Sequence, residues 1–210
     1  MSICAWCTEI ACAKEDRAQQ PRGCPMASGE WLPQSRSAYA LQENRTIAQA
    51  AAHTEKTGYC QWTRLEEIAQ FAQYSNYNRI GLAFCSGLHK EARIVADFFK
   101  SRGLAVFSAI CCMGGIDKAE VGIPPQDRFS SEGFEAMCNP IGQANLLNEV
   151  KTDFNVVLGL CVGHDSLFFR YSAAPVTVLA AKDRVLGHNP LAAVYCAHSY
   201  YKSKLSKPSV

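Results

Sequence analysis

Four short apolar runs, separated by segments with helical patterning, constrain the fold of this chain more than any other feature. The runs cover residues 80–84, 104–110, 156–160 and 176–180. Apolar strands joined by helical crossovers are typical of a parallel sheet that helices cover on both faces. The sequence therefore predicts an α/β fold: a three-layer, Rossmann-like or flavodoxin-like domain with a mostly parallel sheet.

The first 36 residues differ from the rest of the chain. They are punctuated by Cys, Gly, Pro and Ser and sustain neither a helical nor a strand period. Such a segment cannot build a core alone, so it needs a metal or docking to another part of the protein. We therefore divide the chain into a cysteine-rich metal-binding segment, residues 1–36, and an α/β domain, residues 37–210.

Two helix starts can be placed within the α/β domain. Thr63 and Glu66 have the spacing of a capping box, in which the side chain of each residue accepts a hydrogen bond from the backbone N–H of the other. Asn139 and Pro140 predict a second start, with Asn as the cap and Pro at the first helical position. Residues 38–53 are rich in good helix formers and predict an earlier helix.

Bulk properties argue against several functional classes. The formal net charge is only +2, and no basic stripe indicates a nucleic-acid partner. No apolar run is long enough to span a membrane. The first residues lack the basic and apolar regions of a secretory signal. We therefore expect a cytoplasmic protein without a membrane or nucleic-acid partner, and the sequence does not indicate its oligomeric state.

Cysteine is the unusual component, with 11 residues in a chain of 210. In a reducing compartment disulfides are rare, and clustered cysteines more often bind metal or take part in redox chemistry. The alternative is that several are small buried hydrophobic residues, because free cysteine is commonly buried. We expect this alternative for Cys196, and it is also open for Cys60 and for one of Cys111 and Cys112.

The first cysteine group lies in the N-terminal segment, with the spacing Cys4-x2-Cys7-x4-Cys12-x11-Cys24-Pro25. Four thiolates in such a short segment can converge on one tetrahedral or cubane centre. The closing Cys-Pro is similar to bacterial ferredoxin segments, although the other spacings differ. The group strongly predicts a metal site but only weakly which metal, because an iron–sulfur cluster such as 4Fe–4S and zinc could be held by the same four ligands.

The second cysteine group depends on the predicted sheet. Cys85, the pair Cys111 and Cys112, and Cys161 each directly follow an apolar run, and Cys138 precedes the helix that Asn139 caps. The carboxyl ends of parallel strands share one edge, where ligand sites form. We therefore expect Cys85, Cys138, Cys161 and one of the adjacent pair to share a metal site, and we choose Cys112.

Polar residues follow the same strand ends. His164 and Asp165 come after Cys161, whereas Asp183, Arg184 and His188 come after the fourth run. They could bind a cofactor or substrate, assist proton transfer or orient the metal ligands. For each residue taken singly, a helix cap or a loop hydrogen bond is the more ordinary role.

Several long motifs together resemble a known family. They lie at residues 80–85, 111–117, 138–140, 158–168 and 182–190, in addition to the N-terminal cysteines. They are similar to an uncharacterised cysteine-rich metal-binding family, a domain of unknown function found largely in anaerobic microbes. The resemblance implies metal binding, and the habitat of the family makes oxygen-sensitive iron–sulfur chemistry plausible.

Three functional hypotheses remain open at this point. The first is a redox or metal-handling protein in which a cluster near the N-terminus passes electrons to a second centre at the sheet edge, and which could have a redox protein as its partner. The second is an enzyme whose sheet-edge metal binds a substrate, assisted by His164, Asp183 or His188. The third is a zinc-stabilised binding module without catalysis. The sequence does not indicate the substrate or the electron partner.

Overall fold

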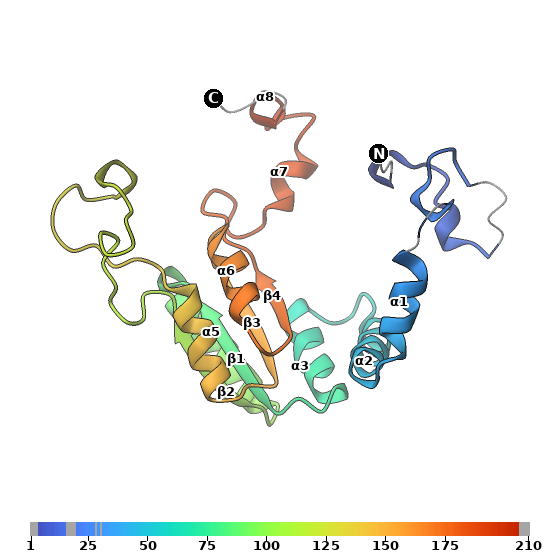
Figure 1. Cartoon of the computed structure of the whole chain (residues 1–210), viewed down its shortest axis with the longest axis horizontal. Coiled ribbons are helices and arrows are strands. Elements are labelled where there is room, and N and C mark those ends of the chain that lie inside the picture. Colours follow the sequence, from blue (N-terminus) through green and yellow to red (C-terminus); the bar gives the residue numbers. More distant parts are fainter. Residues whose placement is uncertain (1–3, 16–19, 28, 30, 206–210) are drawn as a thin grey trace. The chain divides into compact units, whose positions relative to one another are not determined.

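The computed structural model describes residues 4–15, 20–27, 29 and 31–205 (Figure 1). It divides into two compact units, Met1–His53 and Thr54–Val210. The first unit thus extends beyond the 36 residues of the segment delimited from the sequence. Helix α2 (Gln42–Gly58) runs across the boundary between the two units.

The second unit is built on a four-stranded sheet with the order β2-β1-β3-β4. Every neighbouring pair is parallel, which confirms the predicted α/β class. The strands are β1 (Arg79–Phe84), β2 (Ala105–Ile110), β3 (Phe154–Leu158) and β4 (Val176–Ala180). The register places Phe84 opposite Ile110 on one side and opposite Leu158 on the other.

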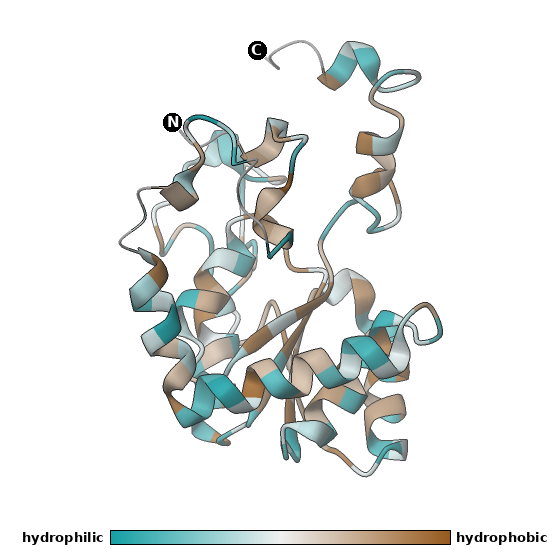
Figure 2. Ribbon diagram, turned by 90° about the vertical axis from the view of Figure 1, so that its right-hand side faces the viewer, coloured by the Kyte–Doolittle hydropathy of each residue, from teal (hydrophilic) through white to brown (hydrophobic). Residues whose placement is uncertain are grey.

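Helices cover both faces of this sheet. Helices α3 (Arg64–Tyr74) and α4 (His89–Ser101) pack on one face, around Leu82, Phe99 and Val156. Helices α5 (Pro140–Glu149) and α6 (His164–Tyr171) pack on the other face, around Ala83, Leu147 and Phe168. Figure 1 shows α5 and α6 in front of the strands, and Figure 2 shows the hydrophobic colouring of the strands that they enclose.

Local sequence signals account for two helix starts. The Thr63 hydroxyl accepts a hydrogen bond from the Glu66 N–H, and the Glu66 carboxylate accepts one from the Thr63 N–H at 2.8 Å. The Asn139 side chain accepts a hydrogen bond from the Gly142 N–H at 2.8 Å, and Pro140 is the first residue of α5. The predicted capping box and the predicted Asn-Pro start are both confirmed.

The remaining elements are short, apart from the two helices near the N-terminus. The first unit holds α1 (Trp31–Ala40) and most of α2, which together replace the single helix expected at 38–53. The 3₁₀ turns are η1 (Cys4–Trp6), η2 (Ala11–Ala13), η3 (Pro25–Ala27), η4 (Ser86–Leu88) and η5 (Pro125–Asp127). Two helices follow the sheet, α7 (Leu191–Tyr195) and α8 (Lys202–Leu205).

A long loop joins β2 to α5 and has cysteines at both ends. It leaves the sheet after Cys112 and returns at Cys138. An antiparallel bridge between Asp117 and Ala136 closes its base, next to an ion pair between Lys118 and Glu135. Figure 1 shows this loop, in yellow-green, projecting from the end of the sheet that carries the cysteines.

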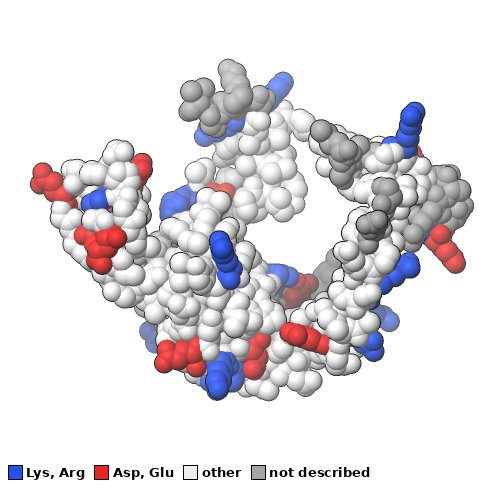
Figure 3. Space-filling model, in the orientation of Figure 1, with Lys and Arg blue, Asp and Glu red and all other residues white. Residues whose placement is uncertain are grey.

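On the side of the sheet-bearing unit that Figure 3 shows, acidic and basic side chains lie close together at several places. Among the described residues, no helix combines the length and the apolar character needed to cross a bilayer.

Candidate functional site

The carboxyl ends of three strands and the start of α5 bring four cysteines to one edge of the sheet. Backbone hydrogen bonds join these segments: the Cys85 N–H donates to Leu158 O at 3.1 Å, and the Cys111 N–H donates to Phe84 O at 2.9 Å. The Asn139 N–H donates to Cys111 O at 2.6 Å. Cys85, Cys111 and Cys138 are therefore held together by the main chain and not only by side-chain packing.

The Cys111 thiol lies at the centre of this group. Cys111 is buried, with 2% of its surface exposed, and its sulfur accepts a hydrogen bond from the Ser86 N–H at 3.2 Å. A hydrogen bond from the Cys138 thiol lowers the pKa of Cys111 most, and bonds from Ser86 and Cys85 lower it further, against the opposing effect of burial. These donors favour the thiolate form of Cys111.

Cys138 shows the opposite behaviour. Its hydrogen bond to Cys111 raises the pKa of the Cys138 thiol, and burial and the nearby sulfurs of Cys111, Cys161 and Cys85 raise it further. The hydrogen bond between the two thiols therefore favours the thiolate at Cys111 and the protonated thiol at Cys138. The same interactions place Cys161 and Cys85 close enough to Cys138 to influence its charge.

Arg184 lies on the solvent side of the group. Its guanidinium donates a hydrogen bond to the Cys161 sulfur at 3.1 Å, and this contact raises the pKa of Arg184. Arg184 is exposed, and Val162 beside Cys161 is 94% exposed. The cysteine group is thus buried at Cys111 and open to solvent at Cys161.

Asp183 and His188 shape the loop that carries Arg184. The Asp183 N–H donates to His188 Nδ1 at 3.0 Å, and the His188 N–H donates to Asp183 O at 2.9 Å. The Asp183 carboxylate also accepts from the Val185 and Leu186 N–H groups. Because Nδ1 of His188 acts as an acceptor, the neutral ring carries its proton on Nε2. These contacts indicate a structural role for both residues.

His164 and Asp165 form the first turn of α6. Their N–H groups both donate to Cys161 O, at 3.0 and 3.1 Å, so that Cys161 also starts the helix. The Asp165 carboxylate accepts from the Ser166 N–H at 2.8 Å. The Nδ1 atom of His164 is buried and has no hydrogen-bond partner in the part of the chain that the structure describes.

The structure shows different surroundings for Cys111 and Cys112, which the sequence alone could not distinguish. Cys111 packs with Cys85 and Cys138 on the α5 and α6 side of the sheet, in the cluster that also contains Ala83 and Ala109. Cys112 is half-buried in the turn that follows β2. The contacts therefore favour Cys111 over our choice of Cys112, while the identity of any metal ligand stays a prediction.

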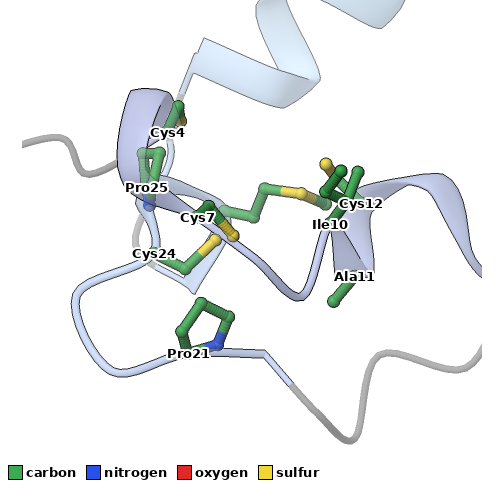
Figure 4. Close-up of a pocket in the computed structure, with 9 residues that line it drawn as sticks. Cys4, Cys7, Ile10, Ala11, Cys12, Pro21, Cys24 and Pro25 are labelled. Carbon is green, nitrogen blue, oxygen red and sulfur yellow. The ribbon is translucent and has the colours of Figure 1, made fainter. Parts of the chain in front are cut away.

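The four N-terminal cysteines line one pocket of about 100 Å³ in the first unit (Figure 4). Cys4 and Cys12 belong to η1 and η2, and Cys24 directly precedes η3. The Gln20 amide donates a hydrogen bond to the Cys24 sulfur at 3.4 Å. The rest of the lining is mainly apolar and comes from Ile10, Ala11, Pro21, Pro25 and Met26.

As the side chains lie, no set of three or more His, Cys, Asp or Glu residues within 4–15, 20–27, 29 and 31–205 is arranged to hold a metal ion. The thiols of the sheet-edge group form hydrogen bonds with one another instead. Their chemistry nevertheless suits soft metals, because thiolate ligands select zinc and iron–sulfur clusters. Rotation of the side chains would be needed to bring the sulfurs onto one centre.

Sequence reasoning missed Ser86, which bonds to the Cys111 sulfur, and Gln143, which bonds to the ends of the two strands that lead to Cys85 and Cys111. Ser86 follows Cys85 directly, and this adjacency was an available signal. The Gln143 amide donates to Phe84 O at 3.2 Å and to Ala109 O at 2.7 Å, although both residues are far from it in the sequence. The only sequence signal for Gln143 was its position in the first turns of a helix that was predicted to cover the sheet.

Comparison with known proteins places the chain in a family. Residues 24–179 match the profile of a group described as "Protein of unknown function (DUF1847)". The chain belongs to the DUF1847 family. It is also 47% identical over 167 residues to the uncharacterised protein MJ0455 of Methanocaldococcus jannaschii. This alignment covers 80% of this chain and 83% of that relative.

Membership in DUF1847 confirms the resemblance to an uncharacterised family and assigns no activity. The matched residues include Cys24 and all of the sheet-edge cysteines. They leave out Cys4, Cys7 and Cys12 at one end and Asp183, Arg184 and His188 at the other. Function must therefore be argued from the site itself.

Proposed function

We propose that this DUF1847 protein binds a metal centre at the sheet edge, with an iron–sulfur cluster favoured, and that it serves a redox or metal-handling role. One observation carries the proposal: the Cys111 side chain packs with those of Cys85 and Cys138, although the three residues come from separate segments. Cys161 lies close to the same group. If the only role of these residues were to fill space, apolar side chains would serve as well and would avoid the cost of burying thiols that exchange a proton.

Ligand chemistry supports the sheet-edge site. A metal requires deprotonated thiols, and the hydrogen bonds to Cys111 already favour its thiolate. Cys85, Cys111, Cys138 and Cys161 would provide the sulfur ligands, whereas Arg184 would offset part of their negative charge. An iron–sulfur cluster in such a position supplies one-electron transfer, whose potential depends on the hydrogen bonds to its sulfurs.

The N-terminal cysteines form a second proposed site. Cys4, Cys7, Cys12 and Cys24 line one pocket, and the regular structure within residues 4–15 and 20–27 consists of short 3₁₀ turns. Metal binding by such a segment contributes directly to its folding free energy. We propose that this site holds an iron–sulfur cluster or zinc. We also propose that the protein is cytoplasmic and exchanges electrons with a redox protein.

An enzymatic role is the second candidate, and Arg184 is the observation that favours it. Arg184 is exposed while bonded to Cys161, so a solvent-borne ligand could reach the outer side of the cysteine group. A substrate bound there would meet the guanidinium and the metal centre together. A zinc-stabilised binding module without catalysis is the third candidate, because zinc accepts the same thiolate ligands.

Anaerobic purification followed by metal analysis tests the proposal. We expect a brown protein whose broad visible absorption decreases on reduction and which contains both iron and acid-labile sulfide. Colourless protein with stoichiometric zinc would favour the structural module. Protein that holds neither metal, even after anaerobic reconstitution with iron and sulfide, would overturn the proposal.

Cys60 provides a matched control. It is exposed and lies in neither cysteine group. The Cys60→Ser variant should keep the metal content and the spectrum of the natural protein. A combined replacement of Cys85, Cys111 and Cys138 by Ser should remove the metal of the sheet-edge site.

A further inference from the structure

Gln143 is a fully buried polar residue beneath the cysteine group, with 0% of its surface exposed. It lies in α5, one turn after Asn139, and its amide nitrogen reaches across to the sheet. The nitrogen donates to Phe84 O at 3.2 Å and to Ala109 O at 2.7 Å. One side chain therefore joins α5 to the carboxyl ends of both β1 and β2.

The two carbonyl groups belong to the segments that carry the thiols. Phe84 directly precedes Cys85, and Ala109 precedes Cys111 by two residues, so the side chains of Ala109 and Cys111 lie on the same side of the strand. Helix α5 begins two residues after Cys138. Gln143 thus belongs to one of the three segments that carry these thiols and bonds to the other two.

Among the described residues, only one end of the Gln143 amide is hydrogen-bonded. Both partners are carbonyl oxygens, which only accept, so the amide nitrogen must face them. The remaining atom, Oε1, is buried and has no hydrogen-bond partner among the described residues. An unpaired buried acceptor costs about 1–3 kcal/mol, which offsets the gain from the two hydrogen bonds that the amide nitrogen donates.

We propose that Gln143 is a positioning residue that sets the separation of the Cys85, Cys111 and Cys138 sulfurs. It acts through the backbone of β1 and β2 and is not itself a ligand. For the metal-bound state this inference rests on the proposed function. For the metal-free state it depends only on the contacts between the thiols.

Asn155 offers a matched control, because it is a second fully buried amide in the same sheet. It accepts from the Thr152 hydroxyl at 2.8 Å and donates to the Ser172 hydroxyl at 2.8 Å. It lies at the amino end of β3, at the opposite end of the sheet from the cysteines. Replacing it removes a comparable buried amide at the end of the sheet away from the thiols.

The experiment compares Gln143→Met with Asn155→Leu in anaerobic, metal-free protein. The first readout is titration with Co²⁺, whose thiolate charge-transfer absorption reports how many sulfurs bind. The second is the alkylation rate of each sheet-edge cysteine by iodoacetamide, followed by mass spectrometry of the peptides. Denaturant unfolding gives the stability of each variant, and Gln143→Asn serves as a second variant if the Met variant does not fold.

We expect Gln143→Met to weaken Co²⁺ binding by roughly 10-fold to 100-fold, the usual effect of losing an outer-shell partner. It should also change the relative alkylation rates of Cys111 and Cys138. Asn155→Leu should lower stability and leave both readouts unchanged. If the two variants lose stability alike and neither alters Co²⁺ absorption or alkylation, Gln143 is a structural residue and the inference is wrong.

The two proposals can fail separately. If the natural protein binds neither Co²⁺ nor iron, the proposed metal function falls. The alkylation rates of metal-free protein then decide the role of Gln143: a change confined to the Gln143 variant supports it, and unchanged rates overturn it.

Discussion

Cys111 and Cys112 are neighbours in the chain but lie in different environments. Successive side chains of a strand point to opposite faces of a sheet, and Cys111 continues the face of Ala109, towards α5. The register pairs Phe84 with Ile110, so Cys85 and Cys111 come next to each other one residue later. Cys112 follows in the turn, after the strand has ended.

Replacing these two cysteines separately should therefore give different results. Cys111→Ser should remove the metal of the sheet-edge site, because it removes the sulfur that contacts both Cys85 and Cys138. Cys112→Ser should keep most of it. Metal analysis of anaerobically purified variants checks this prediction, and the reverse pattern would show that Cys112 is the ligand.

The thiolate character of Cys111 depends mainly on Cys138. In metal-free protein, Cys111 should react with iodoacetamide at mildly acidic pH, where an ordinary thiol is protonated and unreactive. Cys138→Ala removes the principal donor and should raise the pKa of Cys111, which moves its rate profile to higher pH.

Cys138→Ser is the control for that profile, because a hydroxyl can still donate to the Cys111 sulfur. Its profile should lie between those of the natural protein and Cys138→Ala. Identical profiles for all three proteins would mean that Cys138 does not determine the charge of Cys111.

Arg184 should tune the potential of a cluster bound at this edge. Reduction adds negative charge, and the guanidinium on Cys161 stabilises that charge. Arg184→Gln should therefore lower the reduction potential, on the order of tens of mV, since 59 mV corresponds to a tenfold change for a one-electron couple. Redox titration measures the shift.

Arg170→Gln makes the same change of charge in the last turn of α6, without replacing a residue bonded to the cysteine group. Its potential should stay near that of the natural protein. An equal shift in both variants would indicate a general charge effect and not the contact with Cys161.

At the scale of elements, the close packing of α5 against β1 and β3 requires a glycine at position 81 of β1. A Cβ atom on Gly81 would lie 1.9 Å from Asn155 Oδ1 and 2.8 Å from Leu147 Cδ1. Asn155 is satisfied by Thr152 and Ser172, so its side chain cannot move without breaking buried hydrogen bonds. The close contact of the helix and the strands thus depends on residue 81 having no side chain.

Gly81→Ala should destabilise the α/β unit by about 1–3 kcal/mol, the usual cost of overpacking a core. The expected observation is a lower denaturant midpoint with an unchanged slope. Gly87→Ala is the matched control, because its Cβ would meet only the Cys85 sulfur, at an ordinary 3.9 Å. Equal stability of Gly81→Ala and the natural protein would contradict this account of the packing.

At the scale of the whole molecule, the chain consists of two units with different sources of stability. The α/β unit buries large side chains such as Phe99, Leu82 and Phe168 on the two faces of its sheet. In the first unit, the buried hydrophobic residues within the described ranges are Ala11 and Ala50. Such a unit gains little from apolar burial, so ligand binding should contribute much of its stability.

Replacing Cys7 by Ser should therefore affect the first unit alone. We expect a loss of bound metal and faster proteolysis within the first 36 residues, while the α/β unit keeps its denaturation midpoint. Limited proteolysis and metal analysis check this outcome, with Cys60→Ser as control. Unchanged metal content in Cys7→Ser would count against the N-terminal site.

The sequence by itself determined the fold class, the capping box at Thr63 and the start of α5 at Pro140, because these depend on local patterns of apolar and capping residues. It also placed cysteines at the ends of three strands, since parallel topology brings those ends to one edge. The tertiary structure alone decided that Cys111 meets Cys85 and Cys138, because strand register sets which side chains adjoin. It alone showed the contacts of Gln143 and Arg184, since these join residues that no local pattern relates.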